Sequence, residues 1–128
     1  MTETNYLEPD EIVLIQQELI ELYGGTPGLK SMSLLESATN RPRFKGHDEG
    51  ADLVTQAAAH MFGLAKNHAF HDGNKRIAAA ATSVFLRMNG WRLTCQNDTL
   101  DDFLKGCSVP GWTEEAVIAF VCEHTGLR

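Results

Sequence analysis

Apolar residues recur every three or four positions along most of the chain, which is the spacing of amphipathic α-helices. In residues 9–23 this apolar face consists of Ile12, Ile15, Leu19 and Leu22. Pro9 suits the first turn of a helix, and the glycines at 24 and 25 are typical helix stops. The pattern therefore predicts a helix over residues 9–23.

The next part of the chain is predicted to hold a short helix, a loop and a long helix. The short helix begins at Ser31 or Ser33 and ends near residue 40, because the residue before Pro42 avoids helical backbone. Residues 43–50 are polar and are expected to form a loop. Residues 52–67 are expected to form the long helix, whose apolar face consists of Val54, Ala57, Ala58, Met61, Leu64 and Ala65.

Residues 74–88 leave almost no polar face, so we expect this helix to be the buried central helix of a bundle. Residues 91–95 alternate between apolar and polar, which allows one short strand. Two further helices are expected at about 99–105 and 113–125. The sequence thus predicts one compact all-α domain over residues 1–128, a helical bundle with at most one short strand.

Composition and charge exclude several function classes. The net charge is -6 and the isoelectric point about 5.3, so neither a basic nucleic-acid footprint nor a polybasic membrane patch is present. No apolar run reaches the about 18 residues that span a bilayer. The three cysteines form no CxxC pair and are expected to be reduced thiols. We therefore expect a cytoplasmic protein with no nucleic-acid and no membrane partner.

The most informative stretch is residues 68–76, which read His-Ala-Phe-His-Asp-Gly-Asn-Lys-Arg. The start of the following helix offers free N–H groups and partial positive charge, and together these make an anion site. Gly73 permits a sharp bend close to a ligand, and Asn74 is a favoured helix cap. Lys75 and Arg76 stand where the helix dipole disfavours cations, so a bound phosphate would offset their repulsion.

Three residues of the same stretch carry further hypotheses. A single carboxylate beside phosphates is the usual protein share of a magnesium site, and Asp72 can supply it. Histidine exchanges a proton near neutral pH, so His68 can act as general base for an attacking hydroxyl. Phe70 alternates away from both and is expected to anchor the loop in the core.

Plainer interpretations exist for each of these residues. A histidine at a helix end is often a surface residue, Asp-Gly-Asn is a common turn, and Lys-Arg is usually a solvated pair. They do not explain two cations at the start of a buried helix. A zinc site formed by His60, His68 and His71 is disfavoured, because the loop and Phe70 break the helical register between them. His71 is expected to be exposed.

The motif His-x-Phe-x-Asp-Gly-Asn-Lys-Arg resembles the signature of the Fic/Doc family, and specifically its Doc (death-on-curing) branch. The segments at residues 23–28 and 33–42 also resemble family segments, and the similarity covers about residues 5–125. The resemblance implies a Fic-fold bundle that transfers part of a nucleotide to a protein hydroxyl, with ATP and Mg²⁺ as cofactors. It also implies a role for each matching residue: His68 as base, Asp72 as magnesium ligand, Phe70 as structural anchor, and Gly73, Asn74, Lys75 and Arg76 as the anion hole.

Two positions favour the Doc branch over the adenylylating branch. Lys75 stands where adenylylating Fic enzymes usually carry glycine, and Ala79 stands where they carry a second arginine. The Doc branch is known for kinases that place the γ-phosphate of ATP at the reacting site and modify a translation elongation factor. The expected function is phosphate transfer to a serine or threonine hydroxyl. The alternatives are AMP transfer and a catalytically idle Fic fold that only binds a partner.

The resemblance also implies a partner protein. Many Fic proteins carry an inhibitory segment Ser/Thr-x-x-x-Glu-Gly/Asn, and the nearest match here, Thr4 to Glu8, is followed by Pro9. Proteins of the Doc branch are toxins that a small antitoxin restrains. We expect the antitoxin to dock in an apolar groove flanked by the loop predicted at residues 43–50.

Overall fold

The computed structural model describes residues 3–127, which fold into six α-helices, one 3₁₀ turn and two short strands. The helices are α1 (Pro9–Tyr23), α2 (Met32–Asp48), α3 (Leu53–Asn67), α4 (Asn74–Met88), α5 (Asn97–Lys105) and α6 (Glu114–Glu123), and the 3₁₀ turn is η1 (Gly106–Ser108). The all-α class is thereby confirmed. The predicted bounds of α1 and α4 are correct, and the structure starts α3 one residue after the predicted start.

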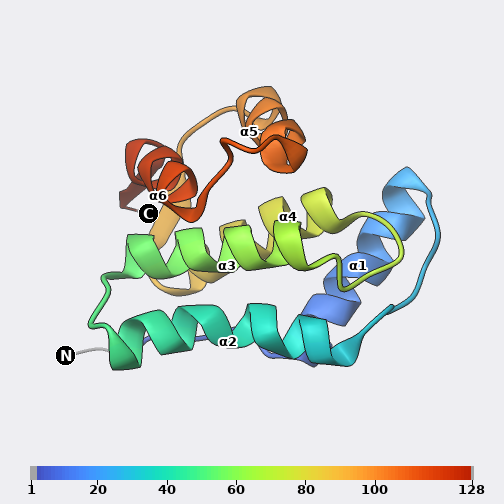
Figure 1. The fold of residues 1–128 in the computed structure, drawn as a ribbon, viewed down its shortest axis with the longest axis horizontal. Helices are drawn as coiled ribbons and strands as arrows, with labels where there is room; N and C mark the ends of the chain where they lie inside the picture. Colours follow the sequence, from blue (N-terminus) through green and yellow to red (C-terminus); the bar gives the residue numbers. More distant parts are fainter. Residues whose placement is uncertain (1–2, 128) are drawn as a thin grey trace.

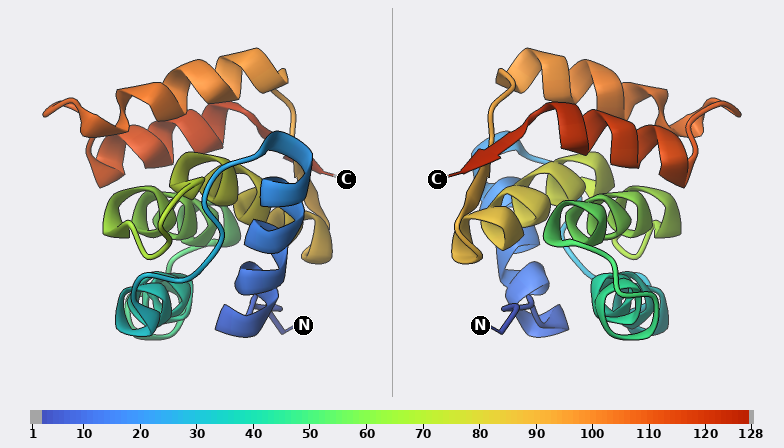
Figure 2. Two further views of the ribbon diagram at one scale, coloured as in Figure 1. Left: turned by 90° about the vertical axis from the view of Figure 1, so that its right-hand side faces the viewer. Right: turned by 90° about the vertical axis from the view of Figure 1, so that its left-hand side faces the viewer.

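The helices pack in layers around a central pair, α3 and α4. Figures 1 and 2 show α2 on one side of this pair, α5 and α6 on the other, and α1 crossing one end. The more buried member of the pair is α3, which packs against α2, α4 and α6. The central position predicted for residues 74–88 is confirmed, although α4 is less buried than its apolar sequence indicated, because Val84 and Met88 face solvent.

Helix α2 is longer than predicted and includes residues 43–48 of the stretch expected to form a loop at 43–50. It passes through Pro42, which is buried inside the helix and lacks an N–H for the helical hydrogen bond. Contacts with α6 offset that loss, because Arg41 and Lys45 both form ion pairs with Glu114. Burial alone would raise the pKa of Glu114, but the hydrogen bonds from the two cations outweigh it and lower that pKa.

Close packing of α2 on α3 adds to this stabilisation. A Cβ atom at Gly63 of α3 would lie 2.9 Å from Cδ of Arg41 and 3.3 Å from Cα of Ala38. Glycine at this position lets the two helix backbones approach. Local proline rules therefore fail here because contacts with two other helices fix the backbone of α2.

The short strand expected near residue 91 is β1 (Trp91–Leu93), and a second strand, β2 (Thr125–Leu127), pairs with it. The strands are antiparallel, with Trp91 opposite Leu127 and Leu93 opposite Thr125. The limit of one strand is thus corrected, and the last helix ends at Glu123. A three-residue strand containing a glycine has no apolar alternation, so its pairing with β1 is not visible in the local pattern. Within residues 3–127, no helix is both long and apolar enough to cross a membrane.

Candidate active site

The loop at residues 68–73 joins α3 to α4 at one end of the central pair. His68 ends α3 in the left-handed conformation, with φ 51° and ψ 48°, and its side chain is exposed. Phe70 lies in the core and is only 2% exposed. His71 and Asp72 are exposed. The buried ring of Phe70 fixes the middle of the loop, while polar side chains on either side of it reach solvent.

The start of α4 lacks a side-chain cap. Gly73 is the capping residue, with φ 78°, and Asn74 is the first helical residue rather than the cap. The Asn74 amide instead turns back to the loop, accepting from the Phe70 N–H (3.2 Å) and donating to its carbonyl (3.0 Å). The expectation that Asn74 caps the helix is therefore wrong. Among the described residues, no acceptor meets the backbone N–H groups of residues 74–76.

A cleft of about 700 Å³ opens at this helix start. One wall holds the predicted site residues with the exception of buried Phe70, together with His71. They are His68, His71, Asp72, Gly73, Asn74, Lys75 and Arg76. The opposite wall belongs to α5 and contains Asp101, Leu104 and Lys105. The α5 wall was not predicted from the sequence. The strong amphipathic pattern of that helix was a signal, because it indicates that one face of the helix is buried and the adjacent face is exposed.

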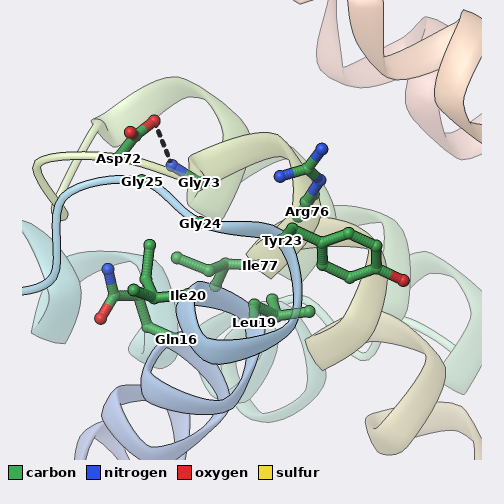
Figure 3. Close-up of a pocket in the computed structure, with 10 residues that line it drawn as sticks. All are labelled: Gln16, Leu19, Ile20, Tyr23, Gly24, Gly25, Asp72, Gly73, Arg76 and Ile77. Atoms are coloured by element: carbon green, nitrogen blue, oxygen red, sulfur yellow. Dashed lines mark hydrogen bonds between the residues drawn. The ribbon is translucent and has the colours of Figure 1, made fainter.

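Asp72 is held by two backbone N–H groups. Its Oδ1 accepts from the Gly73 N–H (2.9 Å, Figure 3), and its Oδ2 accepts from the Thr26 N–H (3.2 Å). In the described part of the chain, no three His, Cys, Asp or Glu side chains come together as a metal site. A lone carboxylate beside an anion site does fit Mg²⁺, which takes most of its ligands from phosphates and water.

The three histidines of the zinc alternative do not meet. His60 is buried in α3, packs edge-on against Phe85 at 5.7 Å between ring centroids, and lies outside the cleft. Burial lowers the pKa of His60 to about 4. Of these three histidines, His68 and His71 line the cleft and His60 does not.

Arg76 stands at the junction of the cleft and a groove along α4. Its guanidinium lies over the Tyr23 ring, 4.5 Å from the centroid, and Figure 3 shows the two side chains together. The groove measures about 450 Å³ and runs between α1, α4, β1 and α5. Ala79 lines this groove, and it occupies the position at which adenylylating Fic enzymes usually carry a second arginine. The apolar residues in this groove are Leu19, Tyr23, Ala79, Ala80, Leu93 and Leu100.

Comparison with known proteins shows which class this architecture belongs to. The model of the Fic/DOC family matches residues 6–86, which contain both the site loop and α4. The chain therefore belongs to the Fic/DOC family.

Two curated proteins are similar to this chain over about two thirds or more of its length. The chain is 31% identical over 86 residues to "Protein kinase doc" of Escherichia phage P1, covering 66% of this chain and 68% of that protein. It is 36% identical over 97 residues to "Toxin Doc" of Mycolicibacterium smegmatis, covering 74% of this chain and 72% of that protein.

Proposed function

We propose that this protein transfers the γ-phosphate of Mg-ATP to a serine or threonine hydroxyl of a target protein. The observation that carries the proposal is the convergence of His68, Asp72 and Arg76 on one cleft at an uncapped helix start. That cleft combines a base, a metal-binding carboxylate and an anion site. Phosphoryl transfer needs little else from a protein than positioning and charge stabilisation.

Each group of residues has one task in the proposed reaction. The free N–H groups at residues 74–76, with Gly73, Lys75 and Arg76, hold the transferred phosphoryl group. Asp72 would hold Mg²⁺, and the ion would supply charge neutralisation at the phosphates. His68 accepts the proton of the target hydroxyl as its oxygen bonds to the γ-phosphorus. The bond from that phosphorus to the bridging oxygen breaks, and ADP leaves.

The choice of γ-phosphate over α-phosphate rests on two residues and one relative. Ala79 offers no arginine at the position, three residues after Arg76, from which adenylylating Fic enzymes grip the outer phosphates of ATP, and Lys75 adds a cation at the helix start. One relative is named a protein kinase. Incubation with a competent target and ATP labelled at the γ- or the α-phosphate tests the assignment. Label from γ is expected, label from α indicates AMP transfer, and no label indicates an idle binding fold.

We further infer that the protein is the toxin of a toxin–antitoxin pair, with a translation elongation factor as its target class. A relative named Toxin Doc supports the toxin role, and the target class rests on the family resemblance alone. The groove along α4 joins the cleft at Arg76, and its mixed polar and apolar lining suits a docked antitoxin segment. The region at residues 43–50 does not flank it, since these residues end α2 at the far end from the site loop (Figure 1). Growth arrest on expression in a bacterial host, lost in His68→Ala, is the expected result.

A further inference from the structure

Residues 25–28 form a backbone strap between α1 and α2 that lies against the site loop. The His71 N–H donates to the Gly28 carbonyl at 3.2 Å, and the next residues continue the pairing through an isolated bridge between Leu29 and Phe70. The Thr26 N–H reaches the Asp72 carboxylate at 3.2 Å. The strap therefore contacts the site loop at its backbone and at the carboxylate proposed to bind Mg²⁺.

The strap is tied to α1 by a buried amide. Gln16 is 1% exposed and occupies an otherwise apolar side of α1. Its Nε2 donates to the Thr26 carbonyl (3.4 Å), and its Oε1 accepts from the Gly28 N–H (3.5 Å). A buried amide left without partners is costly, so these contacts favour one placement of the strap. The N–H group of Thr26 is thereby aimed at Asp72.

Gly25 closes the other side of the carboxylate. Its φ is 112°, and a Cβ atom there would lie 2.7 Å from Oδ2 of Asp72 and 3.2 Å from Cγ. Figure 3 shows Gly25 and Asp72 side by side. The neighbouring Gly24 also has positive φ, 81°, but a Cβ atom there would meet nothing within 4 Å. Both glycines therefore have a backbone conformation that disfavours side chains, but only Gly25 would bring a Cβ atom into contact with Asp72.

We propose that Gln16 and Gly25 are positioning residues that set the orientation of the Asp72 carboxylate before Mg²⁺ arrives. The inference rests on the proposed role of Asp72 as the magnesium ligand. With Oδ1 held by Gly73 and Oδ2 held by Thr26, the carboxylate keeps further lone pairs on both oxygens for a metal. A ligand fixed in advance loses less freedom on binding. Partners of this kind, one step from the metal, typically change metal affinity by about 10–100-fold.

The test compares Gly25→Ala with Gly24→Ala in the full chain. The measurement is the Mg²⁺ concentration that gives half-maximal ATP binding by calorimetry, with thermal unfolding recorded for each variant. Gly25→Ala is expected to raise that concentration about tenfold or more, and Gly24→Ala is expected to match the parent. An equal Mg²⁺ requirement in the two glycine variants would overturn the positioning role.

Gln16→Met keeps the side-chain length without the amide, and it serves if Gly25→Ala does not fold. Its expected effect is a smaller rise in the Mg²⁺ requirement. A second readout needs no metal, namely the solvent exchange of the Thr26 amide proton followed by NMR. Exchange is expected to quicken in Gln16→Met and Gly25→Ala and to stay slow in Gly24→Ala. Unchanged exchange in Gln16→Met would contradict the tie to α1.

Asp72→Ala separates this inference from the function on which it rests. Loss of Mg²⁺-dependent ATP binding in Asp72→Ala, with no difference between the glycine variants, defeats only the positioning role. Unchanged Mg²⁺ dependence in Asp72→Ala defeats the proposed metal role itself.

Discussion

Helices α3 and α4 have the same length and pack side by side, but they begin in opposite ways. The start of α3 is capped by its own chain, since the Asp52 carboxylate accepts from the Thr55 N–H at 2.8 Å. The start of α4 has a glycine cap without a side chain, free N–H groups and two cations in its first turn. The first turn of α3 thus has a side-chain acceptor, whereas the first turn of α4 has neither a side-chain cap nor an acidic residue.

The interior of α3 and the start of α4 also differ in the charge that they favour. The interior of α3 holds His60 with both ring nitrogens unpartnered among the described residues, so it favours the neutral ring. The start of α4 instead concentrates positive charge in a protein whose net charge is -6. This local positive charge is what the proposed binding of a phosphate to an acidic protein requires.

The largest expected effect concerns His68, which ends α3 beside the open start of α4. His68→Ala should lower phosphate transfer by about 10²- to 10⁴-fold, the usual contribution of general-base catalysis, with little change in nucleotide binding. Transfer of label from γ-labelled ATP to the target measures it. His71→Ala is the matched control, because His71 lines the same cleft without a proposed role. Equal activity of the two variants would break the assignment.

The second effect tests the exclusion of charge from α3. Burial lowers the pKa of His60 from 6.5 to about 4, so the unfolded chain takes up this proton more readily than the folded one. The contribution is fully present above pH 6.5 and is lost as the pH falls towards 4. It amounts to about 3 kcal/mol of unfolding free energy. Denaturant titrations at several pH values, compared with His60→Leu, measure the difference, and parallel pH profiles would contradict it.

The third effect compares the two ends of α4. Arg76→Ala should weaken ATP binding by about 10–100-fold, since a hydrogen bond to a charged group is worth about 1.5–3 kcal/mol. Arg87→Ala, in the last turn, should leave ATP affinity unchanged. Without nucleotide, Arg87→Ala should lower the unfolding temperature more than Arg76→Ala, because the helix dipole favours a cation at the C-terminal end. Calorimetry and thermal unfolding supply both measurements, and equal ATP affinities would contradict the anion site.

The smallest effect tests the self-sufficient start of α3. Asp52→Ala removes the cap and should lower the free energy of unfolding by about 1 kcal/mol. ATP affinity should not change, since Asp52 does not line the cleft. Chemical denaturation and calorimetry on the same preparation give both values. A loss of ATP affinity without a loss of stability would remove the distinction between the two helix starts.

Local signals predicted most of the elements that carry the site. A proline start and a double glycine stop gave the bounds of α1, and the position of the motif before an apolar run gave α4. The same stretch predicted most of one wall of the cleft. What failed depended on partners far along the chain. Glu114 stabilises α2 beyond Pro42 from 73 residues away, and no local rule contains that contact.

The strap and the α5 wall were missed for the same physical reason. The Thr26 N–H meets Asp72 across 46 residues, and the partners of Gln16 lie 10 and 12 residues further along the chain. Asp101 reaches the cleft because Leu100 and Leu104 of the same helix are buried and fix its orientation. Such placements follow from tertiary packing, which a single sequence does not display. The residue types were visible in the sequence, and their proximity was not.

The two walls of the cleft come from separate stretches of chain. The wall with His68 and Arg76 lies within the region matched by the family, which ends at Leu86, and the facing wall, α5, begins at Asn97. Asp101 on that second wall has no ion-pair partner in residues 3–127 and is open to an incoming molecule. In engineering terms the exposed face of α5 can be varied, while Leu100 and Leu104 on its other face belong to the core. Exchanging only the exposed residues of α5 for those of a relative would change what faces the cleft while leaving the wall with His68 and Arg76 in place.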